Sequence, residues 1–357
     1  MNNVRLNVAL TFNAKPARQW EGNDNISLNP GDAHPLQTKL TDTYAEWDTW
    51  ETIDAVKSAL EVFHNVTLVE ADEEAFQKLK TLKPDIVFNI AEGFNGVSRE
   101  AQIPAILEML NIPYTGSDPL TLGICLDKAR TKEILTYHNI PTPKFFIIDN
   151  YEQVEKTNLK FPLMVKPNME GSGKGIYSSS LVKNHNELKK EIERINSEYR
   201  QSALVEEFLP GREFTIAVIG NGASANVLPI VEIDFNQFPK DFVPIYSFEA
   251  KWILDTKENS LDVFTCPALV NDELEDMIKG TVLKTYNVLR CRDWSRVDVR
   301  LDADGIPNII ELNPLPGILP DPEENSCFPK AARTAGYNYN DMINLVLFEA
   351  AKRYNLV

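Results

Sequence analysis

A glycine-rich run at residues 161–182, FPLMVKPNMEGSGKGIYSSSLV, has a composition that could bind a phosphate. A Walker-type loop requires GxxxxGK[ST] between a strand and a helix. If Gly173 is the glycine of the GK pair, Asn168 replaces the first glycine of that pattern and Gly175 replaces the serine or threonine. Both flanks are strand-like, so we expect a β-hairpin with positive φ available at Gly171, Gly173 and Gly175. Its N–H groups could then bind an anion, although a plain glycine-rich turn has the same composition.

Oxygen ligands gather in two later segments, WSRVDVRLD and GIPNIIELNPLPG. Glu311 and Asn313 are two residues apart on a predicted strand and therefore share one face of it. Arg296, Asp298 and Arg300 alternate in the same way along the other strand. Carboxylate and amide oxygens suit Mg²⁺ held between protein and substrate phosphates. A solvated strand face would also be polar, but a carboxylate in so apolar a strand is costly to bury without a partner.

The surrounding elements change character along the chain. The first 125 residues alternate between strands and helices, which predicts a doubly wound parallel sheet in an α/β domain. The strands are expected at residues 4–12, 66–71 and 85–93, and one helix at residues 50–63. After residue 212 the pattern is rich in strands, with helices expected at 271–289 and 329–353, so the C-terminal half is predicted to be α+β.

Composition restricts the partners of the chain. It has 357 residues, of which 43% are hydrophobic and 25% charged, and a formal net charge of −16. This charge argues against nucleic acid or an anionic membrane as a partner, but a small anion needs only a few local cations. The four cysteines lie far apart, which predicts free thiols. We find neither a secretory h-region nor a membrane-spanning run, and expect a cytoplasmic protein.

Five segments follow one another in the order found in ATP-grasp enzymes: MVKPNMEGSGKG, LVEEFLPGREFTIAVIG, EAKW, SRVDVRLD and IIELNPLPG. Upstream, LNIPYTGSDPLTLGICLDKARTKEIL resembles the D-alanine–D-alanine ligase branch of that superfamily. The resemblance begins near residue 85. It implies an ATP-grasp fold, in which two lobes clamp ATP behind an N-terminal domain, and a homodimer. The expected domains are residues 1–127, 128–211 with the glycine-rich flap, and 212–357 with the metal site.

The resemblance also implies a role for each matching residue. The nucleotide-binding set would be Lys128 and Lys166 at the phosphates and adenine side, Glu206, Glu207 and Leu209 at the adenine hinge, Glu213 at the ribose, Gly171, Ser172 and Gly173 over the phosphates, and Lys251 at the γ-phosphate. The metal ligands, for two Mg²⁺ or Mn²⁺ ions, would be Asp298, Glu311 and Asn313. The catalytic set would be Arg296, Lys251, Ser172 and the backbone N–H of Gly317.

The implied chemistry is amide formation from a carboxylate and an amine. A carboxylate is a poor electrophile until phosphorylation gives it a good leaving group. Phosphoryl transfer depends mainly on positioning and on neutralising charge, which cations such as Lys166 and Lys251 would provide. The amine then attacks the acyl phosphate through a negatively charged transition state, and preorganised donors such as Arg296 would stabilise that charge.

The departures from the family pattern all affect substrate recognition. A Ser-Ala-Glu-Arg-type segment, whose Glu holds the ammonium of the first amino acid, should follow the first strand, but TFNAKPARQWEGND matches it poorly. The His-Gly…Gly-Glu-Asp-Gly segment of the family reads AEGFNGVSRE here, which keeps Glu92, Gly93 and Gly96 but lacks the histidine. Trp252 replaces a tyrosine after EAK, although it could simply pack between lobes. The serine for the acceptor carboxylate is expected at Ser326, after an unusually long gap.

We therefore predict a carboxylate–amine ligase that joins amino acids or small carboxylates other than D-alanine through an acyl phosphate. A genuine D-alanine–D-alanine ligase with an altered pocket is the main alternative. A biotin-carboxylase-like enzyme fits the YTGSDPLTL segment less well. A non-catalytic protein that binds nucleotide or amino acid would need neither an oxyanion donor nor three metal ligands.

Overall fold

The computed structural model describes residues 5–16, 42–156, 160–238, 243–248, 250, 261 and 263–357. Two predicted site residues, Lys251 and Trp252, lie outside these ranges, as does most of the segment between the first strand and the first helix. No helix in the described ranges is both long enough and apolar enough to cross a membrane.

The N-terminal domain is built on a parallel sheet with the strand order β2-β1-β3. Its strands are β1 (Asn7–Phe12), β2 (Asn65–Glu70) and β3 (Ile86–Asn89), and its helices include α2 (Trp50–Glu61), α3 (Ala75–Leu82) and α4 (Gln102–Leu110). Alternate residues of β1 enter different cores: Val8 and Leu10 pack with α2, while Ala9 packs with α3 and α4. Both faces are thus covered, as a parallel sheet requires, and the predicted α/β arrangement is confirmed.

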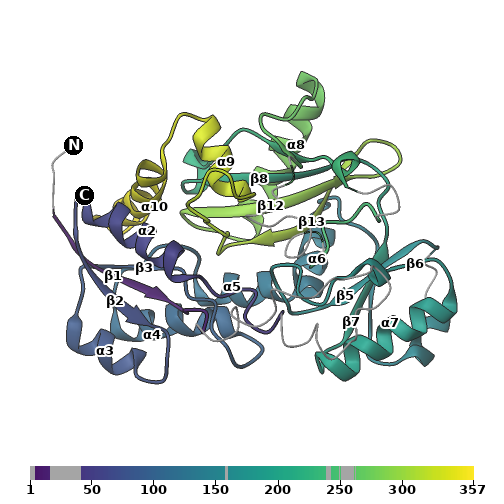
Figure 1. Cartoon of the computed structure of the whole chain (residues 1–357), viewed down its shortest axis with the longest axis horizontal. Coiled ribbons are helices and arrows are strands. Elements are labelled where there is room, and N and C mark those ends of the chain that lie inside the picture. Colours follow the sequence, from purple (N-terminus) through teal and green to yellow (C-terminus); the bar gives the residue numbers. More distant parts are fainter. Residues whose placement is uncertain are drawn as a thin grey trace, which may run out of the picture.

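The end of the chain returns to this domain. Residues 329–353 were expected to form one helix, but they contain the end of α9 (Cys327–Thr334) and the whole of α10 (Tyr339–Arg353). Gly336, with a φ of 91°, ends the first helix in a conformation that favours glycine. Figure 1 shows α10 beside α2, where Asn344 donates a hydrogen bond of 2.8 Å to the carbonyl of Ala59. One core therefore joins the two ends of the chain.

The central lobe contains the predicted hairpin. Its antiparallel sheet has the order β4-β7-β5-β6, with β4 (Phe145–Ile148), β5 (Leu163–Pro167), β6 (Leu181–Val182) and β7 (Ala203–Glu207). Leu163 pairs with Val182, which confirms the hairpin, but the second strand is shorter than expected. The N–H of Tyr177 donates to the hydroxyl of Ser180 instead of joining the ladder. Such local side-chain bonds compete with strand pairing.

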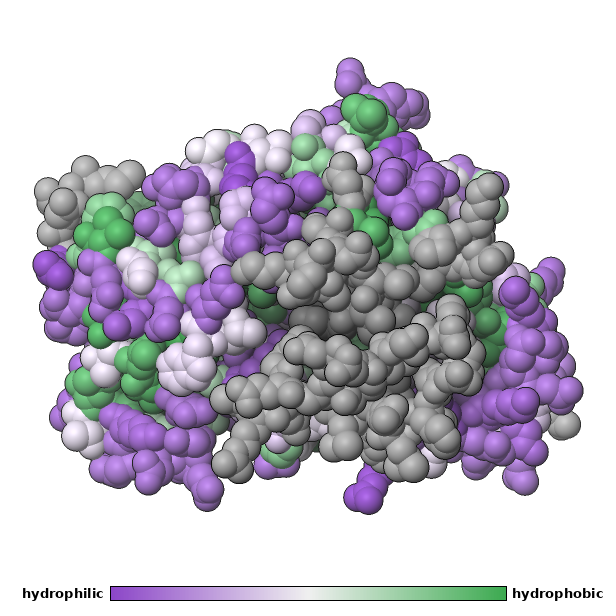
Figure 2. All heavy atoms as spheres, in the orientation of Figure 1, coloured by the Kyte–Doolittle hydropathy of each residue, from purple (hydrophilic) through white to green (hydrophobic). Residues whose placement is uncertain are grey.

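Three helices accompany the central lobe, namely α5 (Pro119–Leu126), α6 (Lys128–Tyr137) and α7 (His185–Glu198). Leu188, Ile192 and Ile195 of α7 are buried against the sheet, while its other residues are mostly charged. The side of the molecule at the right of Figure 2, where Figure 1 draws α7, is correspondingly hydrophilic.

The C-terminal lobe is a mainly antiparallel sheet with the order β11-β10-β8-β12-β13, and β9 pairs with β8. Its strands are β8 (Glu213–Ile219), β9 (Asn226–Val227), β10 (Val231–Ile233), β11 (Phe264–Thr265), β12 (Trp294–Leu301) and β13 (Pro307–Asn313). Val297 and Val299 pack with Ile278 and Val282 of α8 (Asp272–Val288). Because strand residues alternate, the polar residues of β12 face the opposite way, towards the central lobe.

Candidate active site

A cavity of about 220 Å³ lies where the three parts of the chain meet. It is lined by most of the predicted site residues, and a smaller cavity beside it is lined by the rest. The larger cavity contains Glu92, Lys166, Ser172, Gly173, Glu206, Glu207, Leu209, Glu213, Arg296, Asp298, Glu311, Asn313, Gly317 and Ser326. Lys128 and Gly171 line the smaller one. The structure thus gathers every predicted site residue that it describes.

The predicted metal ligands are aligned across two strands. Asp298 is directly opposite Glu311, and Arg296 is directly opposite Asn313 in the antiparallel register of β12 and β13. The register shifts after Asp298, so that Ile310 is an extra residue on β13. Two carboxylates and a carboxamide on adjacent strands are the hard oxygen donors that Mg²⁺ takes. These three residues therefore fit the predicted ion.

Protein cations compensate both carboxylates. Arg296 donates two hydrogen bonds, of 3.1 and 3.0 Å, to Asp298. The ammonium of Lys128 lies 2.8 Å from Glu311. Burial alone would raise the pKa of Glu311, but Lys128 and more distant cations outweigh it and lower that pKa to about 2. Glu311 is therefore firmly ionised at neutral pH.

The predicted nucleotide-binding residues combine a buried charge cluster with an apolar wall of the cavity. Glu206 lies between two ammonium groups, 2.5 Å from Lys166 and 2.9 Å from Lys132. Burial would raise the pKa of Glu206, but the two lysines lower it. Lys132 was missed in the sequence, although it follows Lys128 by one helical turn and so shares its face. Apolar side chains also line the cavity, namely Met164, Phe208, Leu209 and Ile310.

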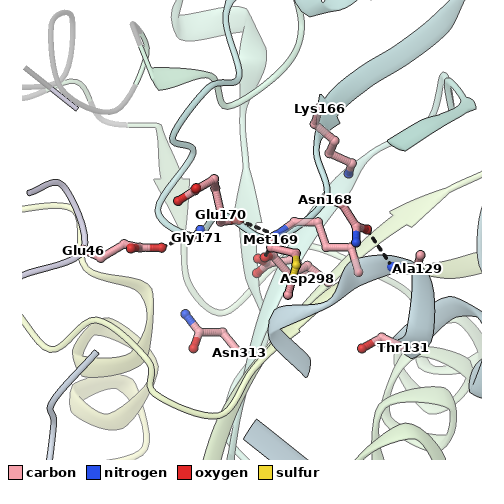
Figure 3. A network of polar contacts seen from close by, with 12 residues as sticks. Glu46, Ala129, Thr131, Lys166, Asn168, Met169, Glu170, Gly171, Asp298 and Asn313 are labelled. Atoms are coloured by element: carbon pink, nitrogen blue, oxygen red, sulfur yellow. Dashed lines mark hydrogen bonds and ion pairs between the residues drawn. The ribbon is translucent and has the colours of Figure 1, made fainter. Parts of the chain in front are cut away.

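The glycine-rich loop has the left-handed backbone that its sequence predicts, at slightly different positions. Ser172, Gly173 and Gly175 have φ values of 52°, 74° and 73°. Gly171 does not have positive φ, contrary to our expectation, and is needed for another reason. Its N–H donates a 2.6 Å hydrogen bond to Glu46, and a Cβ there would lie 2.8 Å from the same carboxylate oxygen. Figure 3 shows Glu46 reaching towards Gly171.

Glu46 is the main residue that the sequence analysis missed. We sought the Ser-Ala-Glu-Arg-type segment directly after β1, but the structure brings residues 42–49 there from beyond the long intervening segment. The N–H of Asp48 donates to the carbonyl of Asn13, which holds this turn against the end of β1. Arg99 lies 2.6 Å from the Glu46 carboxylate. The Ala45-Glu46 pair was the available signal, because it matches two residues of the family segment.

The loop before α9, which contains the predicted acceptor-binding Ser326, lines one part of the cavity. Ser326 donates a hydrogen bond of 3.2 Å to the carbonyl of Gly317 and accepts one from the N–H of Leu319. The gap that appeared too long in the sequence therefore folds back on itself. Among the residues that the structure describes, no acceptor takes the N–H of Gly317, which leaves it available to an oxyanion.

Comparison with known proteins agrees with this geometry. The family model "D-ala D-ala ligase C-terminus" matches residues 134–348. The D-alanine–D-alanine ligase of Bordetella petrii is 31% identical over 288 residues, which cover 80% of this chain and 81% of that protein. An uncharacterized protein, y4sG, of Sinorhizobium fredii is 34% identical over 317 residues, 86% of this chain and 90% of its own length.

Solved structures share the fold. The D-alanine–D-alanine ligase of Bacillus anthracis, determined in complex with ATP, has a TM-score of 0.67 and 21% identity, covering 98% of this chain and 99% of that one. The VanG D-Ala:D-Ser ligase of Enterococcus faecalis has a TM-score of 0.65 and 18% identity, covering 97% of this chain and 100% of that one. This chain belongs to the D-alanine–D-alanine ligase family and is an ATP-grasp, ADP-forming ligase.

Proposed function

We propose that this chain joins an amino acid to an amine-bearing substrate through an acyl phosphate, and that the pair differs from two D-alanines. The observation that carries this proposal is the meeting of three groups in one cavity. Phosphate-side cations, aligned Asp298 and Glu311, and the substrate-side Glu46 lie on its walls. A protein that only bound nucleotide would not need Arg296 and a free Gly317 N–H beside these groups.

Each part of the cavity has a task in this proposal. Lys128 and Lys166 would hold phosphates, while Asp298, Glu311 and Asn313 would hold Mg²⁺, which neutralises phosphate charge when bound. Glu46 would take the ammonium of the first amino acid. When the amine attacks the carboxyl carbon, negative charge develops on the oxygen bound to that carbon. Arg296 and the N–H of Gly317 would stabilise this charge.

The difference from D-alanine rests on the substrate end. Glu92 belongs to the segment from which the histidine of the family pattern is missing, and it lines the cavity together with Glu46. The methyl side chain of D-alanine would need no such additional carboxyl group. Because Glu46 is present, the first substrate is expected to be an amino acid, and D-alanine itself belongs in the test.

The proposal is tested by measuring ADP release from Mg²⁺-ATP with single and paired amino acids and small carboxylates, followed by mass spectrometry of each active mixture. We expect an amide product from a pair other than two D-alanines. A D-alanine dimer as the preferred product would identify a cell-wall-type ligase instead. Nucleotide binding without ADP release from any mixture would contradict ligase activity altogether.

Arg296 gives the sharpest mutational test. Because a preorganised donor at a developing oxyanion contributes about 10²–10³ in rate, Arg296→Ala should lower kcat by that factor. Arg130, an exposed residue of α6 outside the cavity, gives the matched control Arg130→Ala. Near wild-type turnover in Arg296→Ala, with Arg130→Ala also unchanged, would remove Arg296 from the mechanism.

A further inference from the structure

Two acidic side chains beside the glycine-rich loop have no partner in the described part of the chain. Neither Glu92 nor Glu100 has a side-chain hydrogen bond or an ion pair there. Glu100 is only 6% exposed, so this carboxylate is almost entirely removed from water. A buried carboxylate without a partner is costly, and such groups usually face something that compensates them.

Both carboxylates face the same space. Glu92 follows β3, and Glu100 belongs to the short 3-10 helix Arg99–Ala101. Together with Glu46 they line the smaller cavity, whose other walls include Ser172 of the glycine-rich loop and Asn313 of β13. This position is the substrate end of the site, between the residue proposed to take the first ammonium and the residues proposed to hold phosphates and metal.

The nearest cations are already engaged. Arg99 lies 2.6 Å from Glu46 and also donates a hydrogen bond of 3.0 Å to the carbonyl of Met169. Lys128 also lines the smaller cavity, but its ammonium is 2.8 Å from Glu311. Neither cation pairs with Glu92 or Glu100. This end of the cavity therefore has two carboxyl groups for which the described residues provide no paired cation.

The pKa values of Glu92 and Glu100 also reflect the lack of a paired cation. Burial and the neighbouring carboxylate Glu46 raise the pKa of Glu100 to about 8. Burial, with Glu100 and Glu46 as neighbours, also raises the pKa of Glu92. A cation between the two side chains would reverse both effects, because an opposite charge nearby favours the ionised form. Binding of a cationic group would therefore gain from both carboxylates.

We propose that the first substrate is a cationic amino acid, whose side-chain amine or guanidine binds between Glu92 and Glu100 while Glu46 takes its α-ammonium. This inference rests on the proposed ligase function. A metal ion is a weaker occupant, because the described residues contain no group of three or more His, Cys, Asp or Glu arranged to hold one. An organic cation needs only two carboxylates and supplies its own hydrogen-bond donors.

The first test compares matched substrates on the wild-type protein. ADP release with Mg²⁺-ATP is measured for lysine, ornithine, 2,4-diaminobutyrate and arginine against norleucine, norvaline, 2-aminobutyrate and citrulline, each as both enantiomers and with a common set of acceptor amines. We expect kcat/KM to be at least about tenfold higher for the cationic member of a pair. Equal use of the neutral members would overturn the inference and leave the ligase function standing.

The second test removes the charges while keeping the shapes. In Glu92→Gln and Glu100→Gln, the preference for cationic over neutral substrate should fall at least about tenfold, with neutral substrates affected less. Glu73, exposed on the N-terminal domain, gives the control Glu73→Gln. An unchanged preference in both cavity variants would overturn the inference. Calorimetric binding of lysine and norleucine to the wild-type protein with a non-hydrolysable ATP analogue decides the matter if a variant does not fold.

The two proposals fail in distinguishable ways. Tight calorimetric binding of the cationic amino acid without ADP release would support the inference about the pocket and contradict ligase turnover. ADP release with neutral amino acids alone would support ligase turnover and contradict the inference about the pocket.

Discussion

The ion pair of Lys128 and Glu311 joins two elements that are far apart in the sequence. Lys128 is the first residue of α6 and is only 3% exposed, while Glu311 stands on β13. Removing one member of a buried pair leaves the other charged and uncompensated, which costs far more than a surface salt bridge contributes. We therefore expect the pair to stabilise the fold in addition to its proposed role in the nucleotide site.

Lys128→Met should destabilise the protein by about 3 kcal/mol at pH 7, because it removes the cation that lies 2.8 Å from Glu311. Glu311 has a lowered pKa in the folded wild-type protein, so its stabilisation is present above its unfolded pKa and is lost as pH falls towards about 2. In the variant Glu311 takes up a proton more readily. The difference in unfolding free energy should therefore narrow between pH 7 and pH 4, as measured by urea denaturation; a constant difference would contradict the assignment.

A site residue could be placed from the sequence where its position depends only on neighbouring residues in the chain. The alignment of Asp298 with Glu311 could be expected, because alternation on a strand fixes the face of each residue. Glu46 could not be placed, because its position depends on how the long segment before it returns to β1. Lys132 could be recognised as a site residue only once the structure showed that its side of α6 is buried.

At the level of elements, the turn at residues 42–46 holds the glycine-rich loop at both ends. Glu46 accepts from the N–H of Gly171. Asp42 accepts from the hydroxyl of Tyr177 at 3.2 Å and from that of Tyr199. Two carboxylates four residues apart thus tie the flap to the N-terminal domain. A flap held in this way would exclude water from a reactive acyl phosphate.

Asp42→Ala should loosen the flap without removing any nucleotide contact. We expect more ADP per amide product, because water would compete with the amine for the acyl phosphate, and a higher KM for ATP. The exposed Asp54 of α2 gives the control Asp54→Ala. The ratio of ADP to product, from a coupled assay and mass spectrometry, measures the effect. An unchanged ratio would show that Asp42 does not position the flap.

Most elements were predictable because their periodicity was strong, and the exceptions have physical causes. The hairpin was expected, but its second strand is short because Tyr177 and Ser180 bond locally. The last helix was expected to be single, but Gly336 divides it. The domain boundaries stay a prediction. A shared core that includes Ala217 of β8, Ile53 of α2 and Met342 of α10 crosses them.

At the level of the whole molecule, one buried carboxylate connects three parts of the chain that are distant in the sequence. Asp293, just before β12, is fully buried. It lies 2.7 Å from Arg353 of α10 and accepts hydrogen bonds from the N–H of Gly116 at 2.8 Å and from Asn221 at 2.9 Å. The contact unites α10, the N-terminal domain and the C-terminal lobe.

Arg353→Ala should destabilise the protein by about 3–5 kcal/mol, because Asp293 would remain buried without its cation. Lys352, the exposed neighbour on α10, gives the control Lys352→Ala, for which we expect a change within about 0.5 kcal/mol. Urea denaturation of both variants measures the effect. Equal stability of the two would show that the contact is not a structural anchor.

The contact between Asp293 and Arg353 also limits where this chain can be joined to a relative in a chimeric protein. The residues proposed to choose the first substrate, Glu46, Glu92 and Glu100, lie in the N-terminal domain, whereas the proposed metal ligands lie on β12 and β13. A chimera that transplanted only residues 1–127 into a relative would separate α2 from its partner α10. A functional exchange of substrate preference therefore needs two crossover points, so that α10 and Arg353 travel with the domain on which they pack.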